Sequence, residues 1–228
     1  MISSEAAYIA KNYDVDGIHM DDYFYPYPVE NGVFDDTEEY ELYAEGADIS
    51  DWRRDNVNKT VKAIHDAVKD ADPECRFGIS PFGIYANKGT GTPVTGSDTK
   101  GFEAYHSLYC DALTWAKEGY VDYLAPQVYW AFSTSAAPFD VVARWWNANL
   151  DGTGVDLYIG HALYKIEDFP KGEIPIQTEF ARNLLCYSGS IYYGYEQLQK
   201  NTLGICDKIS DMYSKPLPKI RIQALLLP

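Results

Sequence analysis

The densest group of chemically capable residues lies between Asp14 and Pro28, in the run DVDGIHMDDYFYPYP. It holds two adjacent carboxylates, Asp21 and Asp22, with a histidine, His19, two residues before the first of them. Adjacent carboxylates are costly to bury unless they are paired or used, and their like charges push one pKa upward. A raised pKa is what a general acid needs. We therefore predict that Asp21 and Asp22 are catalytic, the alternative being that one of them only caps the following turn.

The residues before this pair predict a short strand, Val15 to Met20. Side chains alternate along a strand, so Gly17, His19 and Asp21 share one face. If that face lines an interior, His19 lies beneath Asp21. We predict that His19 contacts a bound ligand.

Hydrolysis of a glycoside ordinarily uses two carboxyl groups, about 5 Å apart in retaining enzymes and about 6.5–9.5 Å apart in inverting ones. Neighbours in sequence point apart at a strand end, so the second group could come from another strand. Glu196, which follows the last predicted strand, is predicted to lie at the substrate. Asp98, Glu103 and a carboxylate outside the given sequence are further alternatives.

Aromatic and amide side chains follow each of the other predicted strands. Sugars present CH-rich faces that stack on aromatic rings, while amides and imidazoles bind their hydroxyls. This pattern predicts substrate-binding roles for Tyr23, Tyr25, Phe82, Gln127, Tyr129, Trp130, His161 and Tyr164. Each ring on its own could equally be packing.

A metal centre is the alternative use of the histidines. His19, Asp21 and His161 could supply three ligands. No His-Glu-x-x-His run is present, and a lone strand histidine is more often hydrogen-bonded to a neighbour. We expect no metal and no cofactor.

Apolar runs and amphipathic stretches alternate along the whole chain, which is typical of parallel strands joined by helical crossovers. Strands are expected near residues 15–20, 76–81, 120–130, 155–161 and 190–194. Helices are expected near residues 3–12, 52–71, 103–118, 139–150, 176–187 and 202–213.

Two architectures fit this alternation, a doubly wound open sheet and a (β/α)8 barrel. No glycine-rich phosphate loop follows a strand, and polar or aromatic residues follow every strand, as they do around the mouth of a barrel. We predict an α/β fold of (β/α)8 TIM-barrel type, incomplete because about five of eight βα units are present. The domain is expected to span 1–213, with a tail of no assignable structure at 214–228.

The composition of the chain limits the classes of partner that the protein is expected to bind. The 228 residues include 19 Lys and Arg against 34 Asp and Glu, a net charge of −15. A polyanion would be repelled, so the charge argues against nucleic acid and anionic membranes as partners. Apolar residues make up 46% of the chain, enough for a core, yet no run approaches the ~20 residues of a membrane span. No basic start followed by an apolar run is present, so no signal peptide is expected.

Six blocks resemble the glycosyl-hydrolase-like 10 family: VDGIHMDDYFYPYP, WRRDNVN, FGISPFGIYAN, EGYVDYLAPQVYW, GVDLYIGHALYK and GSIYYGYEQL. The resemblance covers about residues 8 to 213 and implies strands four to eight of a (β/α)8 barrel. It also implies an extracytoplasmic bacterial protein linked to hydrolysis of cell-wall glycan. A more distant likeness is to family 18 chitinase-type glycosidases. When the run from Asp16 to Tyr23 is aligned with the Asp-Gly-x-Asp-x-Asp-x-Glu motif of that family, Asp16 and Asp21 match two of its aspartates. His19 replaces the remaining Asp, and Tyr23 replaces the Glu that acts as the acid.

The sequence therefore predicts a glycoside hydrolase acting on a polysaccharide, with peptidoglycan glycan strands as the substrate. Asp21 and Asp22 form its carboxylate centre. Two alternatives stay open: a carbohydrate-binding barrel without turnover, and a metal-assisted carbohydrate hydrolase or deacetylase.

Overall fold

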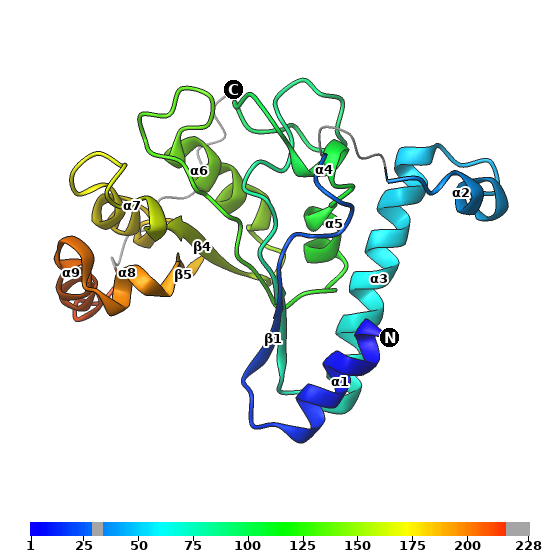
Figure 1. Ribbon diagram of the computed structural model, residues 1–228, viewed down its shortest axis with the longest axis horizontal. Coiled ribbons are helices and arrows are strands. Elements are labelled where there is room, and N and C mark those ends of the chain that lie inside the picture. Colours follow the sequence, from blue (N-terminus) through cyan, green and yellow to red (C-terminus); the bar gives the residue numbers. More distant parts are fainter. Residues whose placement is uncertain (29–33, 218–228) are drawn as a thin grey trace.

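The protein is built on a sheet of five parallel strands that neighbour one another in chain order (Figure 1). The computed structural model describes residues 1–28 and 34–217. The strands are β1 (Gly17–Met20), β2 (Arg76–Ile79), β3 (Tyr123–Leu124), β4 (Asp156–Ala162) and β5 (Tyr187–Tyr193). Each pairs with the next, so every strand runs in the same direction.

This strand order separates the two expected architectures. A doubly wound sheet reverses its order at a switch point, whereas a barrel adds each strand beside the last. The order β1-β2-β3-β4-β5 has no reversal. The α/β fold with TIM-barrel-type pairing is thus confirmed, as a partial barrel whose sheet is not closed within the described residues.

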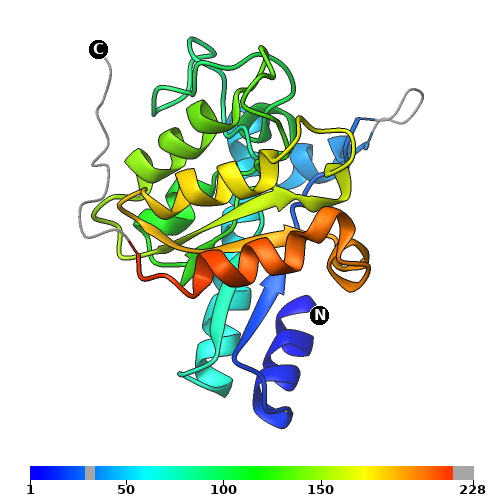
Figure 2. The same cartoon turned by 90° about the vertical axis from the view of Figure 1, so that its left-hand side faces the viewer.

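Helices connect the strands and pack against the sheet (Figure 2). The longest, α3 (Ile49–Ala71), packs along α1 (Ile2–Asn12) and against β2. The others are α2 (Thr37–Tyr43), α4 (Ala104–Ser107), α5 (Ala112–Lys117), α6 (Phe139–Leu150), α7 (Glu173–Arg182), α8 (Tyr195–Gln199) and α9 (Ile205–Tyr213). Short 3-10 turns cover Leu163–Lys165 and Thr202–Gly204.

Among the elements that differ from the sequence-based expectation, three have a local physical reason. The helix expected over 103–118 is divided into α4 and α5, because Tyr109 takes a left-handed conformation (φ 53°) and Asp111 then caps a new helix. The strand expected over 120–130 is short, since Pro126 has no N–H to donate to a ladder. The helix expected over 176–187 begins at Glu173 and ends at Arg182, because β5 starts at Tyr187.

The core lies between the sheet and the helices. Alternate strand residues Phe77, Ile79, Leu124, Leu157 and Ile159 are each 0% exposed. The period of two assigns these side chains to one face, and the intervening ones face the opposite side of the sheet.

His161 belongs to this helix-facing set, so the prediction that it faces the sugar cleft is wrong. Its side chain is 0% exposed and stacks between the rings of Phe139 on α6 and Tyr192 on β5. Its ring nitrogens are hydrogen-bonded to Gln177 (3.2 Å) and Ser190 (2.9 Å). His161 lies two residues beyond Ile159 on a strand that continues to Ala162, which places it on the same face as Ile159.

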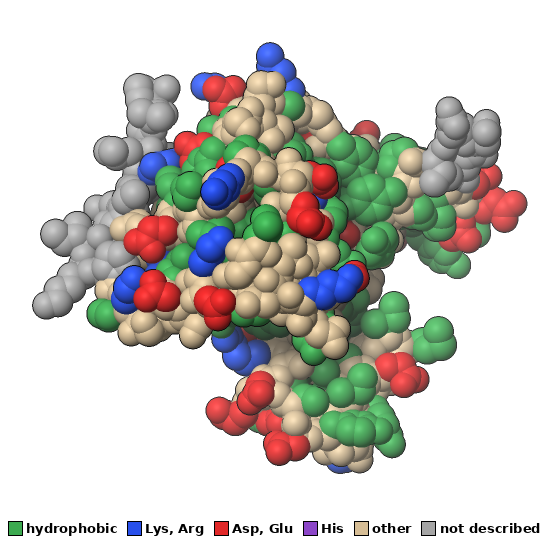
Figure 3. Space-filling model, turned by 60° about the vertical axis from the view of Figure 1, so that its left-hand side comes forward, with side chains coloured by type: hydrophobic (Ala, Val, Ile, Leu, Met, Phe, Trp, Pro, Cys, Tyr) green, Lys and Arg blue, Asp and Glu red, His purple; other side chains and the backbone are tan. Residues whose placement is uncertain are grey.

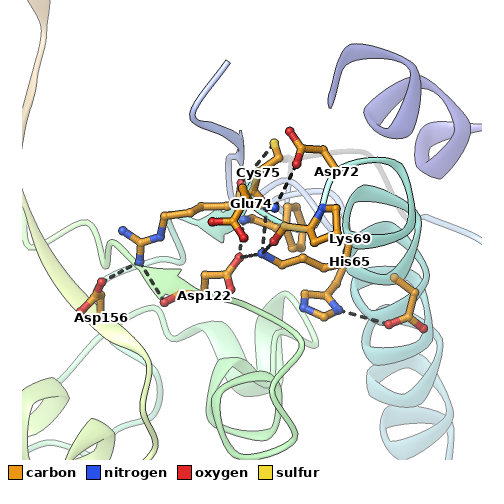
Figure 4. A network of polar contacts seen from close by, with 11 residues as sticks. His65, Lys69, Asp72, Glu74, Cys75, Asp122 and Asp156 are labelled. Carbon is orange, nitrogen blue, oxygen red and sulfur yellow. Dashed lines mark hydrogen bonds and ion pairs between the residues drawn. The ribbon is translucent and has the colours of Figure 1, made fainter. Parts of the chain in front are cut away.

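A polar network joins the beginnings of the strands at the opposite end from the predicted site (Figure 4). Asp122 accepts hydrogen bonds from Lys69 (2.8 Å) and from the backbone N–H of Phe77 (2.7 Å). Arg76 donates to Asp156 (2.6 Å) on β4. These contacts connect α3 with the first residues of β2, β3 and β4, and so help to fix the strand register.

Apolar side chains are also exposed on α1. Ile2, Tyr8 and Ile9 are 56%, 57% and 41% exposed, and Figure 3 shows hydrophobic side chains on the projecting lower part of the molecule. Basic side chains on the same view stand beside acidic ones rather than in a cluster. Within residues 1–28 and 34–217, no helix is both long enough and apolar enough to cross a membrane.

The expected tail divides into two parts. Residues 214–217 lie against the domain: Arg182 donates to the carbonyl oxygens of Lys215 (2.6 Å) and Pro216 (3.3 Å), and Leu217 packs on the core. The rest of the tail, 218–228, lies outside the described residues.

We predict that the contacts of Asp122 contribute measurably to the free energy of unfolding. Asp122→Ala leaves the Phe77 N–H without its acceptor and removes the ion pair with Lys69, whose ammonium keeps the Cys75 carbonyl oxygen (2.9 Å). We therefore expect it to lower the free energy of unfolding by about 1–3 kcal/mol. Asp55→Ala removes an exposed ion pair with Lys59 and serves as the control, with an expected loss below ~0.5 kcal/mol. Equal losses in urea unfolding of the two variants would contradict the role given to Asp122.

The burial of His161 predicts a pH dependence of stability. Burial lowers the pKa of His161 in the folded protein to about 4, from an ordinary value of 6.5. The unfolded chain therefore takes up the proton first as the pH falls. The stability that His161 contributes is complete above about pH 6.5 and is lost progressively towards pH 4, by on the order of 3 kcal/mol. Urea titrations between pH 7.5 and 4.5 should show a shallower fall for His161→Gln than for the wild type; parallel curves would refute this.

Candidate active site

Three strand ends meet at Asp21, which follows β1 and is exposed. The side-chain amide of Gln127, beyond β3, donates to Asp21 Oδ1 (2.8 Å) and to the backbone carbonyl of Ser80, beyond β2 (3.0 Å). The backbone N–H of Asp22 donates to the same Asp21 oxygen (2.9 Å). Both amide protons of Gln127 are thus used to hold Asp21 in place. The structure brings together Asp21 and Gln127, two of the predicted site residues.

The adjacent carboxylate, Asp22, lies in a different environment. It is 2% exposed, and the hydroxyl of Tyr27 donates to its Oδ2. Burial raises the pKa of Asp22 above its ordinary value; the Tyr27 hydrogen bond opposes this shift and the charge of Asp21 adds to it. The Asp21 carboxylate is therefore exposed to solvent, whereas the Asp22 carboxylate is buried beneath the loop that contains Tyr27.

His19 supports this arrangement from the interior face of the sheet. Its Nδ1 lies 3.0 Å from the hydroxyl of Tyr123, and its Nε2 is hydrogen-bonded to the Ser80 hydroxyl. Its ring stacks on that of Tyr123, with centroids 5.7 Å apart. Burial lowers the pKa of His19, and the charge of Asp21 opposes this shift. Both ring nitrogens are engaged within the protein, which makes His19 a support for the site floor.

Neither Tyr123 nor Ser80 was among the predicted site residues. The available signal was Gly78, which pairs with Tyr123 across the β2–β3 ladder. A Cβ at Gly78 would lie 2.3 Å from the Tyr123 ring, so only glycine allows the ring to lie across β2.

A hollow of about 320 Å³ lies beside Gln127. It is lined by Phe82, Gln127, Tyr129, Trp130, Tyr164 and Lys165. The rings pack at their edges, with Tyr129 and Tyr164 centroids 5.9 Å apart and Phe82 and Trp130 centroids 5.6 Å apart. Burial raises the pKa of Tyr129, and the charge of Asp21 adds to this shift. Gln127 both lines the hollow and donates to Asp21, so the carboxylate lies next to the hollow. Four predicted aromatic residues are thus brought together with Gln127.

Two other residues near the hollow were not predicted. The Lys165 ammonium donates to the backbone carbonyl of Tyr129 (3.1 Å). The ring of Tyr193, at the end of β5, stacks on that of Tyr129 with centroids 6.2 Å apart. Tyr193 ends a strand and alternates with the partly buried Tyr192, which was the signal available for it.

The predicted residues Tyr23 and Tyr25 follow β1 but diverge. Tyr23 is 74% exposed and contacts the edge of Tyr27. The hydroxyl of Tyr25 instead donates to Asp36 (3.0 Å), which is also paired with Arg53 on α3. Burial and the Asp36 contact raise the pKa of Tyr25 to about 12. Tyr25 therefore anchors the loop to α3 and does not reach the hollow.

The alternative carboxylates are also placed by the structure. Glu196 lies in the first turn of α8, 64% exposed and paired with Lys200. Glu103 is buried and accepts from the backbone N–H and side-chain amide of Asn87, so it anchors the loop after β2. Asp98 is exposed on that loop. None of the contacts described for these three residues reaches Asp21.

The residues proposed as metal ligands do not converge. His19 faces the barrel interior, and His161 faces the helices. In the described part of the chain no group of three or more His, Cys, Asp or Glu side chains is placed to hold a metal ion.

Comparison with known proteins gives a consistent assignment. The family model of the glycosyl hydrolase-like 10 proteins matches residues 1–176. The chain is 45% identical over 218 residues to the glycosyl hydrolase YngK of Bacillus subtilis, covering 91% of this chain and 42% of that protein. It is 40% identical over 173 residues to the glycosyl hydrolase DigH of Escherichia coli K12, covering 75% of this chain and 39% of that protein. The chain thus spans about two fifths of the length of these relatives, and it belongs to the glycosyl hydrolase-like 10 family.

Proposed function

We propose that this chain carries the carboxylate and sugar-binding part of a glycoside hydrolase that acts on a polysaccharide. The observation that carries the proposal is the exposed Asp21 carboxylate, held by Gln127 beside an aromatic hollow. Rings that stack on sugar faces and an oriented carboxylate are two of the features that cleavage of a glycosidic bond requires, the third being a second carboxyl group.

In this proposal Asp21 is the carboxylate at the reacting carbon, acting as nucleophile or as base for a water molecule. Asp22 has the raised pKa of a general acid, yet its burial and its hydrogen bond to Tyr27 separate it from the opening. We therefore propose that Asp22 holds the loop that contains Tyr27. The role of general acid then falls to a group contributed from elsewhere in the barrel. This revises the expectation that both aspartates are catalytic.

The polymer we propose is the glycan strand of peptidoglycan, and the location is outside the cytoplasm. Support for both comes from the family resemblance. The hollow itself supports only the wider class of saccharide ligands, since its lining offers rings, one amide and one ammonium.

A second function, glycan binding without turnover, is favoured by one observation. Among residues 1–28 and 34–217, the contacts of Asp21 include no exposed second carboxyl group. Binding needs only the hollow, whereas hydrolysis needs the second carboxyl group as well.

Asp21→Asn separates the two functions. The variant keeps an acceptor for Gln127 but loses the carboxylate, so reducing-end release from solubilised peptidoglycan glycan strands should fall by about 10²–10⁴-fold. Affinity for the same strands should stay within about threefold of the wild type. Asp55→Asn, which alters an exposed carboxylate on α3 paired with Lys59, serves as the control and should leave both quantities unchanged.

Two outcomes would count against the proposal. Unchanged release by Asp21→Asn would remove Asp21 from the reaction. Binding by the wild type without any release would favour the second function over hydrolysis.

A further inference from the structure

The segment from Tyr129 to Phe132 carries part of the aromatic hollow but has no regular structure of its own. It follows β3 after Pro126, and its backbone is held by local contacts at Ala131 and Thr134 together with contacts from other elements. The carbonyl oxygen of Trp130 accepts from the side-chain amide of Gln177 on α7 (3.0 Å). The backbone N–H of Phe132 donates to Glu173 Oε1 at the start of the same helix (2.7 Å). Two side chains of α7 thus hold the backbone on both sides of residue 131.

The orientation of the Gln177 amide follows from its surroundings. Gln177 is 0% exposed, and its Nε2 donates to two acceptors, the Trp130 carbonyl and Glu173 Oε1 (3.0 Å). A flipped amide would set its oxygen against both of these acceptors. Only one orientation therefore satisfies the site, and a buried amide with its partners satisfied is held rigidly.

This orientation determines the protonation of His161. The Oε1 of Gln177 lies 3.2 Å from His161 Nδ1 and can only accept, so the imidazole carries its proton on Nδ1. His161 Nε2 then accepts from the hydroxyl of Ser190 on β5 (2.9 Å). A hydrogen-bonded chain consequently runs from β5 through the neutral His161 ring to the backbone of Trp130.

The Trp130 ring has little room to take another position. It contacts the edge of Phe82, and a Cβ at Gly83 would lie 2.7 Å from its Cζ3 atom. The ring is therefore packed closely over the backbone at Gly83. A shift of the Trp130 backbone would move this ring within the hollow.

We propose that Gln177 and Glu173 are positioning residues that fix the Trp130 ring for sugar binding, a role that rests on the proposed function. Neither side chain reaches the hollow, since Gln177 is fully buried and Glu173 is 6% exposed. They act through the Trp130 carbonyl and the Phe132 N–H. Asp21 and Gln127 are held by separate contacts, so loss of this support affects sugar affinity and leaves the chemical step unchanged.

The test uses four variants that divide the network. Gln177→Met removes the amide, and Glu173→Leu removes the acceptor. Glu173→Gln is the conservative variant, because its side-chain oxygen can still accept from both Phe132 N–H and the Gln177 amide. Thr178→Val is the matched control on α7: Thr178 is fully buried and bonded to Tyr192 and Ile174, away from Trp130.

We expect Gln177→Met and Glu173→Leu to weaken affinity for solubilised peptidoglycan glycan strands by about 5- to 20-fold, or to raise KM by that factor with kcat unchanged. Glu173→Gln and Thr178→Val should stay within twofold of the wild type. Unchanged affinity in Gln177→Met, or an equal loss in Thr178→Val, would overturn the proposal.

A second readout is independent of any glycan. With the tryptophans labelled by fluorine, the 19F resonance of Trp130, identified through Trp130→Phe, should shift in Gln177→Met and Glu173→Leu but not in Glu173→Gln or Thr178→Val. If the wild type binds no glycan and this pattern holds, the proposed function fails while the positioning role stands. An unmoved Trp130 resonance in Gln177→Met refutes the positioning role whatever the protein binds.

Discussion

The amide of Gln127 donates to groups that follow two other strands, the Ser80 carbonyl and the Asp21 carboxylate, and the site depends on this pair of hydrogen bonds. The pair can form only because β1, β2 and β3 run parallel and in order, which brings their carboxyl ends to one edge. The polar contacts of Lys69, Asp122 and Arg76 at the other end of the sheet fix the register from which this geometry follows. The pairing of the strands therefore also determines the geometry of the site.

Two aspartates that are neighbours in sequence receive different environments from this geometry. Asp21 directly follows β1 and is exposed beside the hollow, while Asp22 lies beneath Tyr27 and is buried. Their charges interact, but burial is the larger cause of the raised pKa of Asp22. The structure thus assigns the pair separate tasks, one at the surface and one within the loop.

Strand direction predicted that the residues following successive strands lie at one edge, and the structure brings two of them, Asp21 and Gln127, together there. Period-two alternation predicted which residues of a strand share a face. The same rule, carried two residues further along β4, would have placed His161 with Leu157 and Ile159 against the helices. Tyr25 could not be placed in this way, because a loop has no period and the direction of its side chain depends on Asp36 and Arg53. The role of α7 behind Trp130 was equally hidden, since it depends on a contact between residues 47 positions apart.

The geometry of the site depends on the contact between Asp21 and Gln127, and a double-mutant cycle measures the strength of this contact. Asp21→Ala, Gln127→Ala and the double variant would be compared by their free energies of binding to solubilised glycan strands. We predict that the two losses are not additive, with a coupling of about 1 kcal/mol or more, because each side chain orients the other. Losses that add to within ~0.3 kcal/mol would show that the two side chains act independently, and would contradict this prediction.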